Sequence, residues 1–220
     1  MNQFIKNAII LTVITLSAGV LLGFVYELTK GPIAASKEKA RQKAYQQIFP
    51  DANEFEDSTI LDEKEADKLL GDAGLSHCHI DQVVNAKKNQ EHIGYIITVT
   101  NSQGYGGDIQ LSLGVYQDGR TGGISIQSIH ETAGLGMKAK EPEFYGQFAD
   151  KNTQAFQVVK GGTPQGNTDA TSGATSESVA AETENIDAIS GATITSNAVT
   201  EAVNAGLLYY QYMTTGGRVK

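Results

Sequence analysis

Hydroxyl side chains gather just before the last amphipathic segment of the chain. Residues 187–195 read Asp-Ala-Ile-Ser-Gly-Ala-Thr-Ile-Thr. The hydroxyls here and at the next position belong to Ser190, Thr193, Thr195 and Ser196. Because Gly191 and Ala192 are small, a bulky partner could reach the Thr193 hydroxyl without a steric clash. Thr193 is therefore the main candidate for a reactive residue in this sequence.

The segment that begins at Asn197 is predicted to be a helix. Its apolar residues share one face, namely Val199, Val203, Leu207 and Tyr210. Serine and threonine at the start of a helix usually cap its free N–H groups. The same N–H groups and their partial positive charge also favour an anion. Two interpretations stay open: a capped helix, and a phosphate held at the helix start with Thr193 as its covalent attachment point.

A near-copy of the hydroxyl segment lies 18 residues upstream. Residues 169–175 read Asp-Ala-Thr-Ser-Gly-Ala-Thr. The stretch after Thr175 has almost no apolar face, whereas an amphipathic helix follows Thr193. We therefore predict Thr193 as the main site and keep Thr175 as a candidate second site.

Two other segments contain residue types that could bind a metal ion or a ligand. His77-Cys78-His79 has the composition of a metal site, but no fourth ligand follows at a zinc-like spacing, so we interpret it as the start of a strand. A single cysteine excludes an internal disulfide framework. Residues 130–136 read His-Glu-Thr-Ala-Gly-Leu-Gly after a predicted strand, which suits either a ligand edge or an ordinary surface turn.

The elements that must position these residues indicate an α+β domain with an antiparallel sheet and flanking helices. Alternating apolar residues predict a three-stranded meander, and Gly-rich turns separate its strands at 93–99, 109–115 and 124–129. Helices are expected at 38–49, around 63–70 and at 142–148, and a further strand at 155–159. The Ser/Thr/Gly-rich stretch 161–186 is expected to be a loop within the domain 76–220.

The first 30 residues form a predicted transmembrane anchor. Residues 8–26 carry no charge and are long enough to cross a bilayer core, so we place a span at about 8–28, with a cleaved signal peptide as the alternative. Gly19 and Gly23 form a GxxxG pattern, a weak indication of a face for other membrane subunits. A helical region over 31–75 is expected to link the anchor to the domain.

The net charge of −8 argues against nucleic-acid binding, which needs clustered lysine and arginine. No lysine or arginine occurs between Gly161 and Gly217, so a phosphate on Thr193 would be met by backbone N–H groups or by distant lysines. Lysines and one arginine gather after the span, at Lys30, Lys37, Lys39, Arg41 and Lys43. By the positive-inside rule they would place the domain in the cytoplasm.

Taken together, these motifs resemble the covalent-FMN subunits of the Rnf and Na⁺-translocating NADH:quinone reductase complexes. The resemblance rests on the single N-terminal span, the Gly-Tyr-Gly-Gly turn at 104–107, the Glu131–Gly136 loop and the Asp-x-x-Ser-Gly-Ala-Thr motif that ends at Thr193. It covers nearly the whole chain and is greatest to RnfG, then to NqrC. The family usually has proline where this chain has Ala133.

The resemblance implies the cofactor and its attachment. In this family a phosphoester joins FMN to the threonine that ends the motif, here Thr193, and a flavin transferase that recognises the motif's aspartate, here Asp187, makes the bond from FAD. The resemblance also implies other flavin-binding residues. They are Ser190, Gly191, Ala192 and Thr195 beside the attachment point, and Glu131, Thr132, Gly134, Leu135 and Gly136 in the upstream loop.

The resemblance implies an electron-carrying subunit of a membrane complex that couples ferredoxin:NAD⁺ electron transfer to ion movement. Its partners would be the other Rnf subunits, and the chain alone would turn over no substrate and hold no metal. Family membership places the domain outside the cytoplasm, against the charge rule. The alternatives are the NqrC-like subunit of an NADH:quinone reductase and, in another class, an anchored non-redox interaction module.

Overall fold

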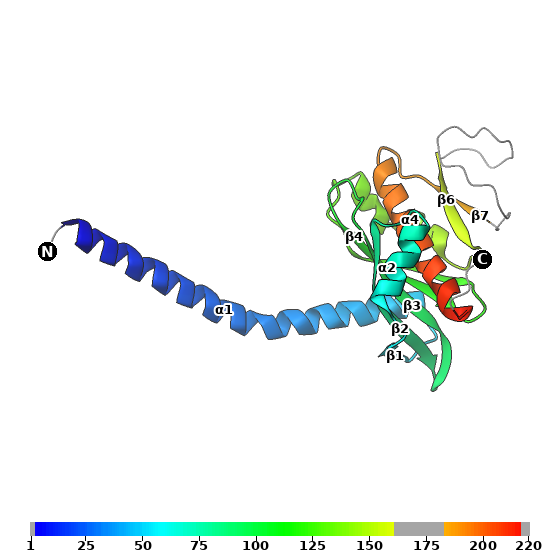
Figure 1. The fold of residues 1–220 in the computed structure, drawn as a ribbon, viewed down its shortest axis with the longest axis horizontal. Coiled ribbons are helices and arrows are strands. Elements are labelled where there is room, and N and C mark those ends of the chain that lie inside the picture. Colours follow the sequence, from blue (N-terminus) through cyan, green and yellow to red (C-terminus); the bar gives the residue numbers. More distant parts are fainter. Residues whose placement is uncertain (1–2, 161–182, 217–220) are drawn as a thin grey trace. The chain divides into compact units, whose positions relative to one another are not determined.

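The computed structural model describes residues 3–160 and 183–216. The chain divides into two units, Met1–Lys43 and Ala44–Lys220. The described residues of the first unit belong to α1 (Gln3–Ile48), which continues through Pro32 as one helix (Figure 1). An 18-residue window of α1 has a mean hydropathy of 2.5 and no buried residue, so by length and composition the helix could cross a membrane.

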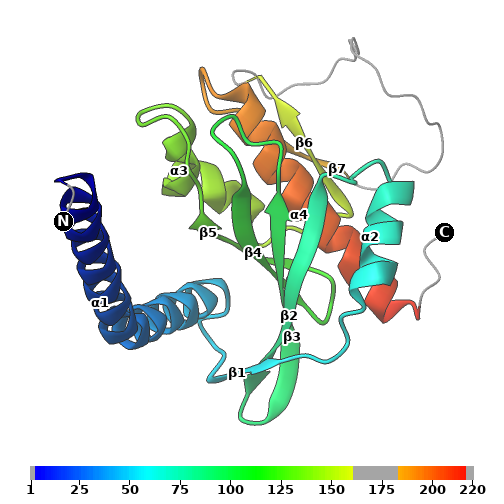
Figure 2. The same ribbon diagram turned by 60° about the vertical axis from the view of Figure 1, so that its left-hand side comes forward.

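The second unit is built on a five-stranded antiparallel sheet in the order β1-β2-β3-β4-β5 (Figure 2). Its strands are β1 (Glu54–Asp57), β2 (Cys78–Lys88), β3 (Glu91–Asn101), β4 (Ile109–Tyr116) and β5 (Thr121–Ser128). The predicted meander corresponds to β3, β4 and β5, and the α+β class is confirmed. Two strands differ from the expectation, because β1 lies inside the region expected to be helical over 31–75 and β2 extends far beyond its predicted start.

Alternation along the strands gives the sheet two apolar faces. In the β2–β3 pair, Val83 is opposite Ile97 and the next pair is Val84 opposite Ile96. Val83 and Ile97 belong to the main core, whereas Val84 and Ile96 pack in a second cluster with Tyr45, Ile48 and Phe49. Successive side chains of a strand point to opposite faces, so each face needs its own cover. The end of α1 and the residues after it provide the cover for the second face.

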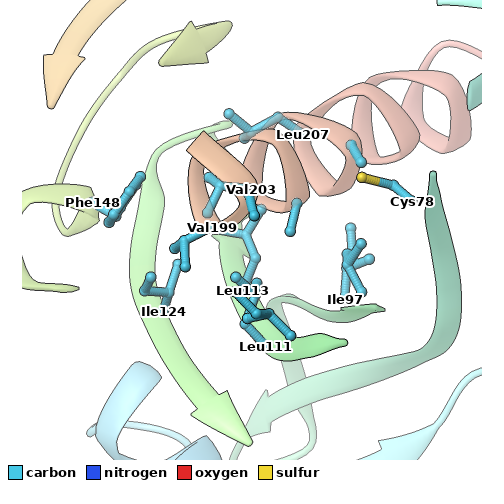
Figure 3. Packing of buried hydrophobic residues seen from close by; sticks show 14 of the residues in the cluster. Cys78, Ile97, Leu111, Leu113, Ile124, Phe148, Val199, Val203 and Leu207 are labelled. Carbon is cyan, nitrogen blue, oxygen red and sulfur yellow. The ribbon is translucent and has the colours of Figure 1, made fainter. Parts of the chain in front are cut away.

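The main core lies between the sheet and α4 (Thr193–Thr214), which crosses one face of the sheet (Figure 2). Figure 3 shows Val199 and Val203 of α4 on the side of the helix that faces Leu111 and Leu113 of the sheet, and all four residues belong to the main core. The apolar stripe predicted from the sequence is thus the buried face of this helix. Small residues bring the helix close, since a Cβ on Gly206 would lie 2.9 Å from Leu113 Cδ2.

Short elements complete the domain. They are α2 (Glu63–Asp72), the 3₁₀ helix η1 (Gly136–Lys140), α3 (Pro142–Tyr145), the 3₁₀ helix η2 (Gly146–Phe148) and the parallel strands β6 (Ala155–Val159) and β7 (Thr183–Asp187). Asp62 caps α2 by accepting the N–H of Lys64 at 3.0 Å and of Glu65 at 3.2 Å. The prediction of a loop over 161–186 is wrong at its end, because residues 183–186 belong to β7. Thr175 lies outside the described residues.

Candidate functional site

A cleft of about 560 Å³ opens at the start of α4. Three segments line it: the turn before β4, the loop after β5 and the first residues of α4. The lining residues are Tyr105, Glu131, Thr132, Leu135, Gly136, Gly191, Ala192, Thr193, Ile194 and Thr195. The structure therefore brings together most of the site residues proposed from the sequence, from segments some 60 residues apart in the chain. The volume of the cleft lies in the range of small-molecule sites.

The start of α4 differs from the expected side-chain cap. Ala192 is the N-cap residue and no side chain caps the helix there, while Thr193, the first helical residue, is exposed. Ser196 instead closes the preceding loop: its Oγ accepts the Ile189 N–H at 2.9 Å and donates to the Ala192 carbonyl at 3.0 Å. A helix start without a side-chain cap keeps N–H groups available to an anion.

Two glycines let the loop after β5 approach this helix closely. Gly191 has φ of 77°, and a Cβ there would lie 3.2 Å from Leu135 Cδ2. A Cβ on Gly136 would lie 2.7 Å from Thr195 Oγ1 and 2.7 Å from Glu131 Cβ. The positions of Gly136 and Gly191 therefore leave no room for a larger residue without a shift of the cleft wall.

The turn before β4 forms the third wall, and Glu131 ties it to the loop. The Gly106 N–H donates to Glu131 Oε1 at 3.3 Å. A side chain on Gly106 would overlap the His130 carbonyl, and one on Gly104 would overlap the Gly107 carbonyl. Tyr105 stands between these glycines and lines the cleft, although the sequence-based site did not include it. An aromatic residue between two glycines was the available signal.

Three predicted site residues lie elsewhere. Asp187 and Ser190 line a neighbouring hollow of about 470 Å³, which also contains Lys138 and Gln147, and Gly134 lines neither space. Gln147 holds the backbone of Asp187, since its Oε1 accepts the Asp187 N–H at 2.7 Å and its Nε2 donates to the Asp187 carbonyl at 3.4 Å. The Asp187 side chain remains exposed.

The charges of the cleft are one-sided. Glu131 is the carboxylate among the ten lining residues, and none of them is a lysine or arginine. Among the lining residues, a phosphate at Thr193 would therefore depend on backbone N–H groups, which is one of the two possibilities that the sequence left open. Lys138 lines the hollow of Asp187 instead of the cleft.

The His-Cys-His triplet has a structural role at the start of β2, because both histidines contact carboxylates and the cysteine is buried. His77 Nε2 lies 2.9 Å from Glu201 Oε2, and His79 Nδ1 lies 2.8 Å from Asp67 Oδ1. Burial, with a smaller contribution from the Glu201 carboxylate, raises the pKa of the Cys78 thiol to about 12. Within residues 3–160 and 183–216, no group of three or more His, Cys, Asp or Glu side chains could hold a metal ion.

Comparisons with known proteins match both units. Residues 104–208 match the FMN-binding domain family and residues 1–48 match the RnfG N-terminal region. The G subunit of the Na⁺-translocating ferredoxin:NAD⁺ oxidoreductase complex of Acetobacterium woodii is 31% identical over 211 residues, which cover 95% of this chain and 92% of the relative. The G subunit of the proton-translocating complex of Clostridium ljungdahlii is 31% identical over 206 residues, with 94% and 91% covered.

A solved structure is similar in fold. It is the C subunit of the Na⁺-translocating NADH-quinone reductase of Parabacteroides distasonis, with a TM-score of 0.52 and 21% sequence identity. The match covers 81% of this chain and 93% of that one. At this identity the similarity concerns the fold alone.

Proposed function

The chain belongs to the family of G subunits of ion-translocating ferredoxin:NAD⁺ oxidoreductase (Rnf) complexes, and from that premise we propose that Thr193 carries FMN through a phosphoester. The protein is a membrane-associated, single-pass member of a translocase complex, and its domain binds FMN. The flavin supplies the electron-transfer chemistry, and the protein supplies position and electrostatics. The other membrane subunits are its partners.

One observation carries the proposal: the exposed Thr193 lies inside a cleft at a helix start that no side chain caps. The Thr193 hydroxyl is accessible, so its oxygen can attack the FMN phosphorus of FAD, with loss of its proton and with AMP as the leaving group. Free N–H groups of the first turn are available to the phosphate oxygens. Gly191 and Gly136 let the cleft walls approach the site closely, and exposed apolar side chains border it. The residues present therefore fit a tethered flavin with an apolar ring and an anionic phosphoester.

We assign Asp187 to recognition by a flavin transferase. Its backbone is held by both ends of the Gln147 amide, while its carboxylate faces solvent beside the neighbouring hollow. That arrangement presents Asp187 to another protein during maturation and leaves Thr193 free for the transfer.

The NqrC-like alternative has less support. The similarity to the solved quinone reductase structure is one of fold, whereas residues 1–48 match the N-terminal region of RnfG. A non-redox interaction module is disfavoured by the match of residues 104–208 to FMN-binding domains.

Denaturing gel fluorescence tests the attachment. The chain, expressed with a flavin transferase, should give a fluorescent band that survives denaturation. Thr193→Ala should abolish the band, and the matched Thr175→Ala variant in the near-copy should keep it. A wild-type chain without a band would contradict covalent flavin, and loss of the band in Thr175→Ala alone would move the site to the near-copy.

A further inference from the structure

Exposed apolar side chains of the domain are concentrated at the cleft. Among residues 44–160 and 183–216, the exposed large apolar side chains are Ile60 (52% exposed), Tyr105 (71%), Leu135 (43%) and Ile194 (53%). Three of these four line the cleft that contains Thr193, and only Ile60 lies elsewhere. Single exposed apolar residues on a surface need no explanation, but their concentration around one concave site indicates an apolar ligand.

The aromatic member of this group stands on a fixed turn. The glycines on both sides of Tyr105 are packed so closely that a side chain on either would overlap a backbone carbonyl. Glu131 adds a hydrogen bond from the turn to the loop on the next wall. The backbone of Tyr105 is thus held in place, while its ring is largely free of protein contacts.

We propose that Tyr105 provides the aromatic face against which the isoalloxazine ring of the flavin on Thr193 packs. This inference rests on the proposed function, because it takes its ligand from the attachment at Thr193. Planar aromatic systems prefer offset stacking or edge-to-face contact, and a ring held at the opening of the cleft can make either contact with a tethered flavin. Tyr105 is then a positioning residue that sets the orientation and solvent exposure of the ring.

Flavin fluorescence tests this inference, because a phenol or indole ring in contact with a flavin quenches its emission. The full chain is expressed with a flavin transferase, and emission from the folded protein is divided by emission from the same sample after denaturation. This ratio corrects for the amount of flavin attached. The variants are Tyr105→Leu, which loses the aromatic ring, Tyr105→Trp, which keeps one, and the control Ile60→Ala at the exposed apolar residue outside the cleft.

An aromatic contact of the usual strength favours the stacked, quenched flavin about two- to tenfold. Loss of this contact in Tyr105→Leu should therefore raise the ratio by a similar factor. It should stay low in Tyr105→Trp and match the wild type in Ile60→Ala. Because Tyr105 is exposed, far-UV circular dichroism should be unchanged in all variants. Attached flavin with an unchanged ratio in Tyr105→Leu would overturn this inference and leave the proposed function intact. Absence of attached flavin in the wild type would overturn the proposed function, and this inference with it.

Discussion

At the scale of single residues, the site depends on its small residues as much as on its reactive hydroxyl. Thr193 supplies one hydroxyl, but its access depends on glycines and on a helix start where no side chain competes for the N–H groups. Ser196 instead forms hydrogen bonds with backbone groups of the preceding loop, the Ile189 N–H and the Ala192 carbonyl. The hydroxyl cluster therefore divides into two buried residues, Thr195 and Ser196, and two exposed ones, Ser190 and Thr193.

Gly136 tests the importance of close packing in the cleft. In Gly136→Ala, the new Cβ would lie 2.7 Å from Thr195 Oγ1, so the loop or the helix must move. We expect the free energy of unfolding to fall by about 1–3 kcal/mol and flavin attachment to decrease. Urea denaturation and gel fluorescence measure the two effects. Gly71→Ala in α2 is the matched control, because nothing lies within 4 Å of its Cβ and alanine favours a helix.

Cys78 should be inert in the folded protein. Burial raises the pKa of its thiol from 9.0 to about 12, so the folded state disfavours the thiolate. The stabilisation associated with the protonated thiol is fully present below pH 9 and is lost as the pH rises toward 12. Iodoacetamide at pH 8.5 should label Cys78 slowly in buffer and rapidly in urea. Equal rates in both solutions would contradict the burial of the thiol.

At the scale of elements, α4 connects the site to the core. Its first turn carries Thr193, and its middle packs on the sheet. On another side of the helix, Asn204 forms hydrogen bonds with Phe156 of β6. The Asn204 side chain accepts the Phe156 N–H at 2.8 Å and donates to the Phe156 carbonyl at 2.9 Å. A helix held along its length keeps its first turn at a fixed distance from the loop after β5.

Asn204→Ala measures that connection. It leaves two backbone groups of Phe156 without these partners, so the free energy of unfolding should fall by about 1–3 kcal/mol in urea denaturation. Asn197→Ala, at an exposed position of the same helix, should change it by less than about 0.5 kcal/mol. Equal effects of the two substitutions would show that Asn204 contributes no more than helix propensity.

Sequence periodicity identified α4, α2 and the meander because their patterns are regular. Only the start of β2 was predicted, at the His-Cys-His triplet, because a register shift between Ile80 and Gln82 interrupts the alternation of the rest of the strand. β7 has one buried residue, Ile186, and its parallel partner β6 is distant in the chain, so no local pattern indicated it. The position of Tyr105 at the cleft likewise depends on a long-range contact, between its turn and residues 130–131.

At the scale of the whole molecule, an apolar helix and an FMN-binding domain are joined in one chain. A covalent tether would keep the flavin on a domain outside the cytoplasm, because no replacement would be supplied there. We propose that orientation from family membership, although Lys30 and the basic residues after the span favour the opposite one. Long domains are translocated largely regardless of their charge, so the two observations are compatible.

Cysteine labelling of intact cells tests the orientation. Lys68 is exposed on α2, so Lys68→Cys should react with a membrane-impermeant maleimide added outside the cells. The wild type is the control, because its only cysteine, Cys78, is buried. Labelling of Lys68→Cys that appears only after the cells are opened would place the domain in the cytoplasm.

The central claim is that Thr193 carries the flavin, and peptide mass mapping tests it most directly. The mature chain, made with its flavin transferase, is digested, and the peptides that contain Thr193 and Thr175 are measured separately. We predict that the Thr193 peptide carries the mass of FMN joined with loss of water. An unmodified Thr193 peptide, or a flavin on the Thr175 peptide alone, would contradict the account.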